Sequence, residues 1–215
     1  MTQANDSLLV TPGTGATLAT HAVASKEHQV VMIADADGHI QGSPPVYKLI
    51  VNGSAVGASK VHCDLFNADG TLILKVVSAR VIPDIDTAVT GVVSAEVHLT
   101  RTTAVGTGGT AMTLENTALT GISIVEMDTS NPALDADITA RTQTAGGATA
   151  GALLGTRHIF TEETNAGAAL AAMIGAQFVE PGYPIMVRPS QGLRFVQGAV
   201  ASVGTLNFEI IFEVL

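Results

Sequence analysis

The sequence predicts an all-β protein whose strands form an antiparallel β-sandwich or barrel. Short runs rich in valine, isoleucine and threonine are separated by glycine, proline, asparagine and aspartate at intervals of about ten residues, as in proteins of these classes. The chain has 215 residues, which is enough for one sizeable core. We therefore expect one domain.

The clearest strand lies over residues 206–214. Its alternate side chains divide into an apolar set and a mostly polar set. The apolar set is Leu206, Phe208, Ile210, Phe212 and Val214, and the other set is Asn207, Glu209, Ile211 and Glu213. This alternation predicts a strand with one buried face that pairs inside a sheet, so its truncation should destabilise the fold.

Several other segments are expected to be strands. In residues 61–77, two apolar runs flank Asn67-Ala68-Asp69-Gly70, whose Asp-Gly pair tolerates positive φ and predicts a β-hairpin. Further runs cover residues 29–34, 46–51, 94–100, 122–126, 185–188 and 193–197. Together these runs predict about eight to ten strands.

Composition divides the chain into two parts. Residues 1–28 contain few bulky side chains and predict an extended N-terminal arm, and residues 29–215 form the predicted β-sandwich domain, which is expected to be jelly-roll-like. Pro44-Pro45 marks a stiff break before the main body.

Glycine-rich stretches at residues 107–110 and 145–151 predict long loops at the ends of the sandwich. Residues 161–176 have an acidic start and an alanine-rich continuation that suit one short helix. Gly167 and Gly175 weaken that helix, so a helix and an irregular segment both remain open.

Charged residues are scarce, and this predicts a surface that is covered by partners. Only 13% of the chain is Asp, Glu, Lys or Arg, about half the usual share, and the mean hydropathy is +0.39. No apolar run is long enough to span a bilayer, so no membrane association is expected. The net charge of −9 disfavours nucleic-acid binding. The start lacks the features of a secretory signal, so we expect folding in the cytoplasm.

No metal or cofactor site is expected. The glycines at 106, 108 and 109 lack the spacing of a phosphate-binding loop, and Asp35, Asp37 and Gly38 form only a fragment of a calcium loop. Cys63 is expected to be a buried small hydrophobic residue. The six histidines are scattered. His62 and His98 lie in expected strands and could share a metal or pH-sensitive site, but two separate structural histidines are favoured.

The chain is not expected to be an enzyme, and we nominate no catalytic residues. It has no GxSxG nucleophile motif, and Asp135 and Asp137 lie in a turn-rich stretch where they are expected to cap a loop. Tryptophan is absent and there are two tyrosines, which disfavours an aromatic binding platform for sugars or single strands.

Three segments together carry a resemblance to virion proteins of tailed bacteriophages. They are Val10-Thr11-Pro12-Gly13-Thr14-Gly15-Ala16, residues 101–110 (RTTAVGTGGT) and Phe160-Thr161-Glu162-Glu163-Thr164-Asn165. The stretches 187–193 (VRPSQGL) and 197–204 (QGAVASVG) are similar to β-rich structural proteins of such phages. The likeness covers nearly the whole chain, but its motifs are loop and strand-edge patterns.

The resemblance implies a jelly-roll-like β-sandwich that forms homo-oligomers, with a trimer favoured, and binds the major capsid protein as a decoration or cement protein. Its expected location is the capsid surface of a virion assembled in the host cytoplasm. A tail or head-fibre component that binds a host surface is the alternative, and a virion-associated hydrolase is a third hypothesis. The candidate interface residues are Thr11, Pro12, Thr14, Leu18, Val105, Thr107 and Thr110.

Overall fold

A computed structural model describes residues 17–23, 26–34, 40–41, 44–84, 93–114, 121–129, 131–142, 150–161, 175–200 and 203–215. The chain divides into two compact units, Met1–Pro44 and Pro45–Leu215. The boundary between the units falls at Pro44-Pro45, where the sequence predicts a stiff break.

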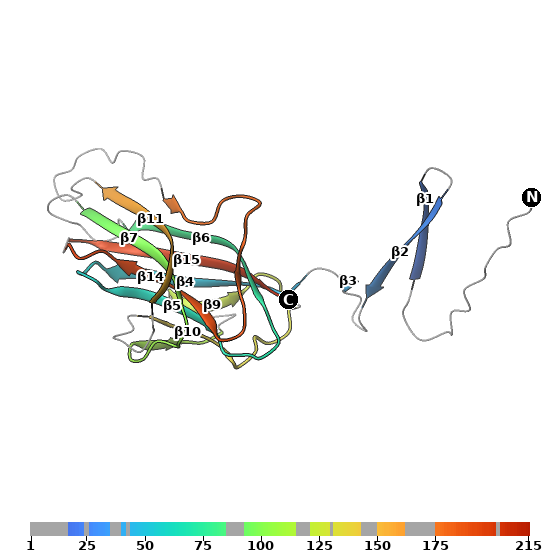
Figure 1. Cartoon of the computed structure of the whole chain (residues 1–215), viewed down its shortest axis with the longest axis horizontal. Helices are drawn as coiled ribbons and strands as arrows, with labels where there is room; N and C mark the ends of the chain where they lie inside the picture. The colour runs from blue at the N-terminus through green and yellow to red at the C-terminus, as the bar shows by residue number, and fades with distance from the viewer. Residues whose placement is uncertain are drawn as a thin grey trace, which may run out of the picture. The chain divides into compact units, whose positions relative to one another are not determined.

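The unit Pro45–Leu215 is a sandwich of two antiparallel sheets, and no helix occurs among its described residues (Figure 1). The first sheet has the order β12 (Ala176–Gln177), β6 (Leu74–Asp84), β15 (Thr205–Val214), β4 (Val46–Ala55) and β9 (Ile122–Glu126), and β13 (Ile185–Val187) also pairs with β6. The second sheet has the order β11 (Ala150–Thr161), β7 (Val93–Thr102), β14 (Gln191–Gln197), β5 (Val61–Asn67), β10 (Ile138–Thr142) and β8 (Thr110–Met112). The predicted all-β sandwich is confirmed.

The strand pairing is that of a jelly roll. β4 pairs with β15, β5 with β14, β6 with β12 and β13, and β7 with β11, so that early strands pair with late ones from the outside of the sequence inward. The pairings of β15 with β6 and of β14 with β7 then join these strand pairs into the two sheets. This interleaving is the double Greek key of the jelly roll. β8, β9 and β10 lie between β7 and β11 in sequence and extend the sheets beyond β5 and β4.

β15 is the central strand of the first sheet, between β6 and β4. Phe208, Ile210 and Phe212 are fully buried, as the alternation predicted, while Val214 is half-buried. The ring of Phe208 lies 5.1 Å from that of Phe195 on β14, so the contact joins the two sheets. At the other end of β15, the Val214 N–H donates to the Pro45 carbonyl oxygen at 3.0 Å.

The predicted hairpin over residues 61–77 is wrong, because β5 and β6 belong to different sheets. The segment between them is an arch held by the buried side chain of Asn67. Its Nδ2 donates to the Leu72 carbonyl at 2.9 Å, and its Oδ1 accepts from the Asp69 N–H at 3.1 Å. The Asp-Gly pair therefore turns the chain from one sheet to the other.

The two predicted glycine-rich loops are shorter than expected. Ala150 and Gly151 begin β11, and Thr110 begins β8. Glycine and alanine concealed the start of β11, which is an edge strand with a register shift between Leu153 and Gly155. The helix considered at residues 161–176 falls mostly on residues outside those described.

The unit Met1–Pro44 contains a small antiparallel sheet. β1 (Thr17–Val23) pairs with β2 (Lys26–Ala34), and β3 (Ile40–Gln41) pairs with the end of β2. The predicted strand at residues 29–34 lies within β2 and is confirmed. β2 runs across residue 28, where the sequence predicted the end of the arm, and the compact unit continues to Pro44.

Replacing the core ring of β15 should cost far more stability than replacing an exposed ring on β11. Phe208 is fully buried and Phe160 is 65% exposed. We expect Phe208→Ala to lower the free energy of unfolding by about 3–5 kcal/mol and Phe160→Ala by less than about 0.5 kcal/mol. Urea unfolding followed by circular dichroism measures both, and equal losses would contradict the assigned burial.

Candidate interaction surface

The outer face of the second sheet carries a row of charged side chains across three neighbouring strands. Cys63 and Leu65 of β5 are in the core, so strand alternation places Asp64 on the opposite face. Asp64 is paired in register with Arg194 on β14 and with Arg141 on β10. A carboxylate thus lies between two guanidinium groups.

A glycine-rich loop, residues 103–109, crosses this row. It leaves β7 and enters β8, on the far side of β14, β5 and β10 in the same sheet. Arg141 Nε donates to the Gly108 carbonyl at 2.8 Å, and the Gly106 amide faces the Asp64 carboxylate. Gly108 and Gly109 have φ of 77° and 61°, which glycine adopts without steric cost. The loop therefore forms a cover over Asp64.

Asp64 is buried beneath this cover, with 2% of its surface exposed. Burial raises the pKa of its carboxyl to about 6, and Arg194, the Gly106 amide and Arg141 offset only part of that rise. Among the described residues, neither carboxylate oxygen accepts a hydrogen bond of good geometry. The loop thus covers a carboxyl group that can take up a proton under mildly acidic conditions.

His62 lies on the inner face of the same strand, fully buried. The register of β5 with β14 shifts beside it, between Phe195 and Val196, and such an irregularity lets His62 and Cys63 share the core face. The ring of His62 stacks on that of Phe208 with centroids 4.5 Å apart, and its Nδ1 is hydrogen-bonded to Ser54 Oγ at 2.8 Å. Burial, and secondarily the charge of Lys60, lower the pKa of His62 to about 4. His62 is therefore a neutral core residue at physiological pH.

His98 has its partners elsewhere, on the outer face of β7 and β11. Its Nδ1 is hydrogen-bonded to Thr156 Oγ1 at 2.9 Å, and its Nε2 lies 3.9 Å from Glu96 Oε2. His158 on β11 brings its own Nε2 to 3.9 Å from Glu96 Oε1. His62 and His98 thus occupy opposite faces of the second sheet, and the favoured prediction of two separate histidines is confirmed.

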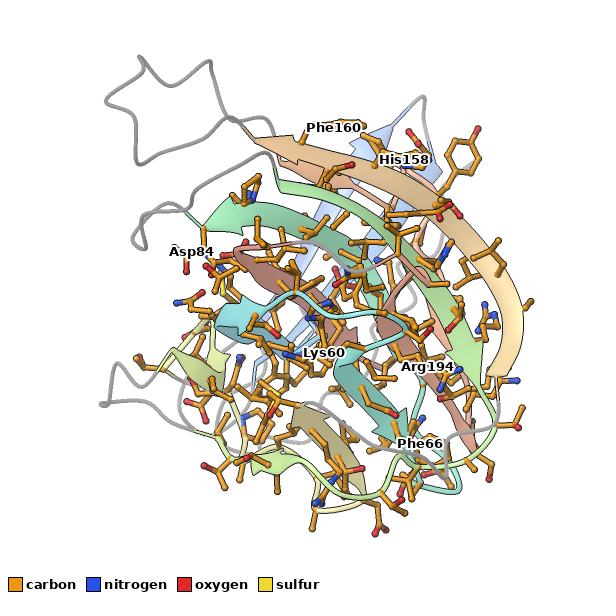
Figure 2. The ribbon with its side chains drawn as sticks, turned by 90° about the vertical axis from the view of Figure 1, so that its left-hand side faces the viewer. Lys60, Phe66, Asp84, His158, Phe160 and Arg194 are labelled. Carbon is orange, nitrogen blue, oxygen red and sulfur yellow. The ribbon has the colours of Figure 1, made fainter. Side chains whose placement is uncertain are left out.

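β11 forms one edge of the second sheet and presents apolar side chains to solvent. Leu153 is 59% exposed and Phe160 is 65% exposed. Figure 2 shows Phe160 beside His158 on this strand, and their ring centroids are 6.3 Å apart. Within the described part of the chain, β11 pairs only with β7, so its outer edge offers unpaired backbone groups.

On the core side of β11, Arg157 connects the edges of the two sheets. Its Nε donates to the Gln177 carbonyl at 3.0 Å, and its guanidinium group lies 5.5 Å from the centroid of the Phe178 ring. This contact holds β11 against β12 and fixes the side of the sandwich on which the exposed edge lies.

The predicted interface residues fall in three places. Thr11, Pro12 and Thr14 lie outside the described residues, and Leu18 lies in β1 opposite Val31. Val105 is 42% exposed, and Thr107 and Thr110 are exposed around the loop that covers Asp64.

The exposed edge of β11 was not among the predicted interface segments. The only signal for it in the sequence was the alternation of Thr156, His158 and Phe160 with Arg157 and Ile159. That alternation is short, and it follows a glycine, so it gives a weak indication of a strand.

Asp135 caps a loop, as predicted, and Asp137 is exposed in that loop. Asp135 Oδ1 accepts the Asp137 N–H at 2.8 Å, and the Asp135 carbonyl accepts the Ile138 N–H at 3.0 Å. Asp69 lies close to both carboxylates. Cys63 is fully buried, which confirms the prediction for this residue, and burial raises the pKa of its thiol.

No family model, no curated protein and no solved structure matches this chain. The described ranges contain no helix that could span a lipid bilayer.

Asp64→Asn should reveal the pH dependence of stability that His62 causes and that Asp64 offsets in the native protein. Folding raises the pKa of Asp64 from 3.8 to about 6, so its contribution to stability is lost as the pH rises from about 4 to 6. Folding lowers the pKa of His62 from 6.5 to about 4, so its contribution is lost as the pH falls through the same range. The two effects oppose each other.

In the Asp64→Asn variant, only the His62 effect remains. We expect the free energy of unfolding of Asp64→Asn to fall by about 2 kcal/mol more than that of the native protein between pH 7.5 and pH 4.5. Urea unfolding at both pH values measures this difference. Asp137→Asn, at an exposed position, is the control, and its free energy of unfolding should change with pH as in the native protein. If the Asp64→Asn variant also shows the same pH dependence as the native protein, the raised pKa of Asp64 is disproved.

Proposed function

We propose that this chain is a non-enzymatic structural virion protein of a tailed phage, which binds the major capsid shell as a decoration or cement oligomer. The observation that supports it most is the exposed, charge-poor edge of the sandwich along β11. Among its described side chains, Arg157 and His158 are the only ionisable ones, and Leu153 and Phe160 face solvent. An edge of this kind normally needs a cover.

The rest of the described surface supports the same proposal. Large apolar side chains are also exposed at several further positions. Isolated soluble domains, by contrast, normally keep their exposed apolar patches small. These exposed side chains are Val105, Met127, Tyr183, Val200, Val203 and Leu215. With charged residues at 13% of the chain, little charge has to be desolvated when such a surface meets a neighbour.

The N-terminal unit adds a second argument. Among its described residues, this unit has one sheet, which consists of two longer strands and a third of two residues. A single small sheet has no second layer on which to bury a face, and isolated hairpins are marginally stable in water. We infer that the sheet is completed by protein in the assembled particle, where a trimer that contacts several capsid subunits binds with avidity.

The jelly-roll fold is compatible with this function, but the fold alone does not distinguish it from other functions. The fold occurs in viral capsid proteins, lectins and cupins, and it carries many unrelated functions. The alternative function, a tail or head-fibre component that binds a host surface molecule, is favoured by the exposed residues Thr107–Thr110 of the loop at the surface. Copy number distinguishes the two, since decoration requires many more copies per particle than a tail or fibre position.

The cement role predicts that β11 variants bind the shell weakly. Capsids stripped of this protein should be disrupted at a lower temperature, and adding the native protein should restore the original temperature. We expect Leu153→Asp/Phe160→Asp to restore little of it, because both charges would have to be buried. Light scattering during heating measures the disruption temperature.

Ala58→Asp is the matched control for the β11 variant, because Ala58 is exposed in the turn before β5, lies outside β11 and is not one of the apolar side chains named above. It should bind and stabilise like the native protein. Full restoration by Leu153→Asp/Phe160→Asp would reject the β11 interface, and stripped capsids of unchanged stability would reject the cement role.

The N-terminal unit is expected to serve assembly and not the stability of the sandwich. Deleting residues 2–43 removes the first compact unit up to the break before Pro45. We expect the remaining sandwich to keep its cooperative unfolding transition and to lose oligomer mass in light scattering. An oligomer of unchanged size would show that the unit is not needed for self-association.

A further inference from the structure

The glycine-rich loop of residues 103–109 covers a carboxyl group whose charge is poorly compensated. The Asp64 side chain lies beneath this loop, and neither of its oxygen atoms accepts a hydrogen bond of good geometry from the described residues. An ionised carboxylate is strongly hydrated, so its removal from water without such hydrogen bonds is costly. The closed loop therefore favours the protonated, uncharged form of Asp64.

Two arginine side chains flank Asp64, and no other titratable side chain shares its row on the outer face. From β7 to β8, the row of cross-strand neighbours consists of Thr100, Arg194, Asp64, Arg141 and Ala111. The loop above the row contains no titratable side chain either. Arg194 Nε donates to Thr100 Oγ1 at 3.3 Å, so this donor serves an acceptor other than the carboxylate.

Desolvation outweighs the groups that favour the carboxylate. Arg194, the Gly106 amide and Arg141 each stabilise the charge, yet burial raises the pKa of Asp64 from 3.8 to about 6. Opening the loop would hydrate the carboxyl group and return its pKa toward 3.8. Because the closed state has the higher pKa, protonation stabilises closure, and this contribution is lost as the pH rises from about 4 to 6.

The loop can open without disturbing the strand pairing beneath it. The side chain of Arg141 attaches it to the sheet through the hydrogen bond from Nε to the Gly108 carbonyl oxygen, and residues 107–109 are exposed. Strand alternation places Thr102 and Thr139 on the same outer face, where their hydroxyl oxygens are buried without hydrogen-bond partners among the described residues. Opening would hydrate these hydroxyl groups as well, which lowers its cost.

We propose that residues 103–109 form a pH-controlled cover, which protonated Asp64 holds closed and which the charge of the Asp64 carboxylate loosens. The cover is most firmly closed under mildly acidic conditions and opens more often at neutral pH. Opening moves Val105 and Thr107, two of the candidate interface residues, so the surface that the loop presents changes with pH. The proposal concerns this chain alone and does not depend on capsid binding.

Amide hydrogen exchange in the full-length protein, measured by nuclear magnetic resonance, tests the cover. After correction for the intrinsic pH dependence of exchange, the protection factor of the Gly106 amide reports how often the loop opens. With a pKa of 3.8 in the open state and about 6 in the closed state, opening becomes about tenfold more frequent between pH 5 and pH 7.5. We expect the protection factor of Gly106 to fall by this amount.

The native protein also provides two internal checks. The loss of Gly106 protection should level off above the pH at which the carboxyl carbon of Asp64 titrates, which the same spectrometer measures in ¹³C-labelled protein. The amide of Ile210 lies in the central strand of the first sheet and exchanges through global unfolding. Its protection should not show the tenfold loss, which separates loop opening from a general loss of stability.

Asp64→Asn keeps the shape of the side chain and removes its titration. In this variant, Gly106 should be protected equally at pH 5 and pH 7.5, whereas the exposed control Asp137→Asn should retain the native difference. The proposal is overturned if native Gly106 is unprotected, if its protection is the same at both pH values, or if Asp64→Asn keeps the tenfold difference. The first two outcomes are decided on the native protein, so the test does not depend on the folding of the variant.

Discussion

The pairing of β15 with β4 and β6 is the constraint on which the rest of the structure depends. The last strand of the chain lies between the first and third strands of the sandwich, so the first sheet cannot form until the whole unit is synthesised. Phe208 on that strand touches His62 and Phe195 from the opposite sheet. This long-range contact fixes the separation of the layers and gives the fold a high contact order, which is typical of slow-folding β proteins.

With the inner faces committed to the core, binding has to occur on the outer faces and edges. In the second sheet, one part of the outer surface is covered by a loop of the same chain, and another part is left exposed. Over β5 and β10, a glycine-rich loop covers Asp64 and Arg141, while over β11 no described segment covers Leu153 and Phe160. The contrast between a face that the chain covers itself and an edge that it leaves open is what locates the candidate interface.

Much of the fold is predictable from the sequence where the alternation of side chains is strong. β15, β4, β9 and β14 lie where alternating or continuous apolar runs predicted strands, because each packs one or both faces on the core. β11 was missed because an edge strand buries little, so Gly155 and Ala150 are tolerated in it and no clear period remains. The hairpin prediction failed since Asp69-Gly70 specifies a change of direction and not the sheet that the next strand joins. The cluster of Glu96 with two histidines depends on the register of β7 with β11, which no local pattern encodes.

The hydrogen bond between Val214 and Pro45 shows that the polypeptide enters and leaves the sandwich at one point. A tensile force applied between the N-terminal unit and the C-terminus would therefore open β4 and β15 like a zipper, one hydrogen bond after another, instead of shearing the whole ladder at once. Mechanical resistance in this direction is low. A force applied through the sides of the sandwich would instead load many hydrogen bonds of the sheets together, so the fold resists it better.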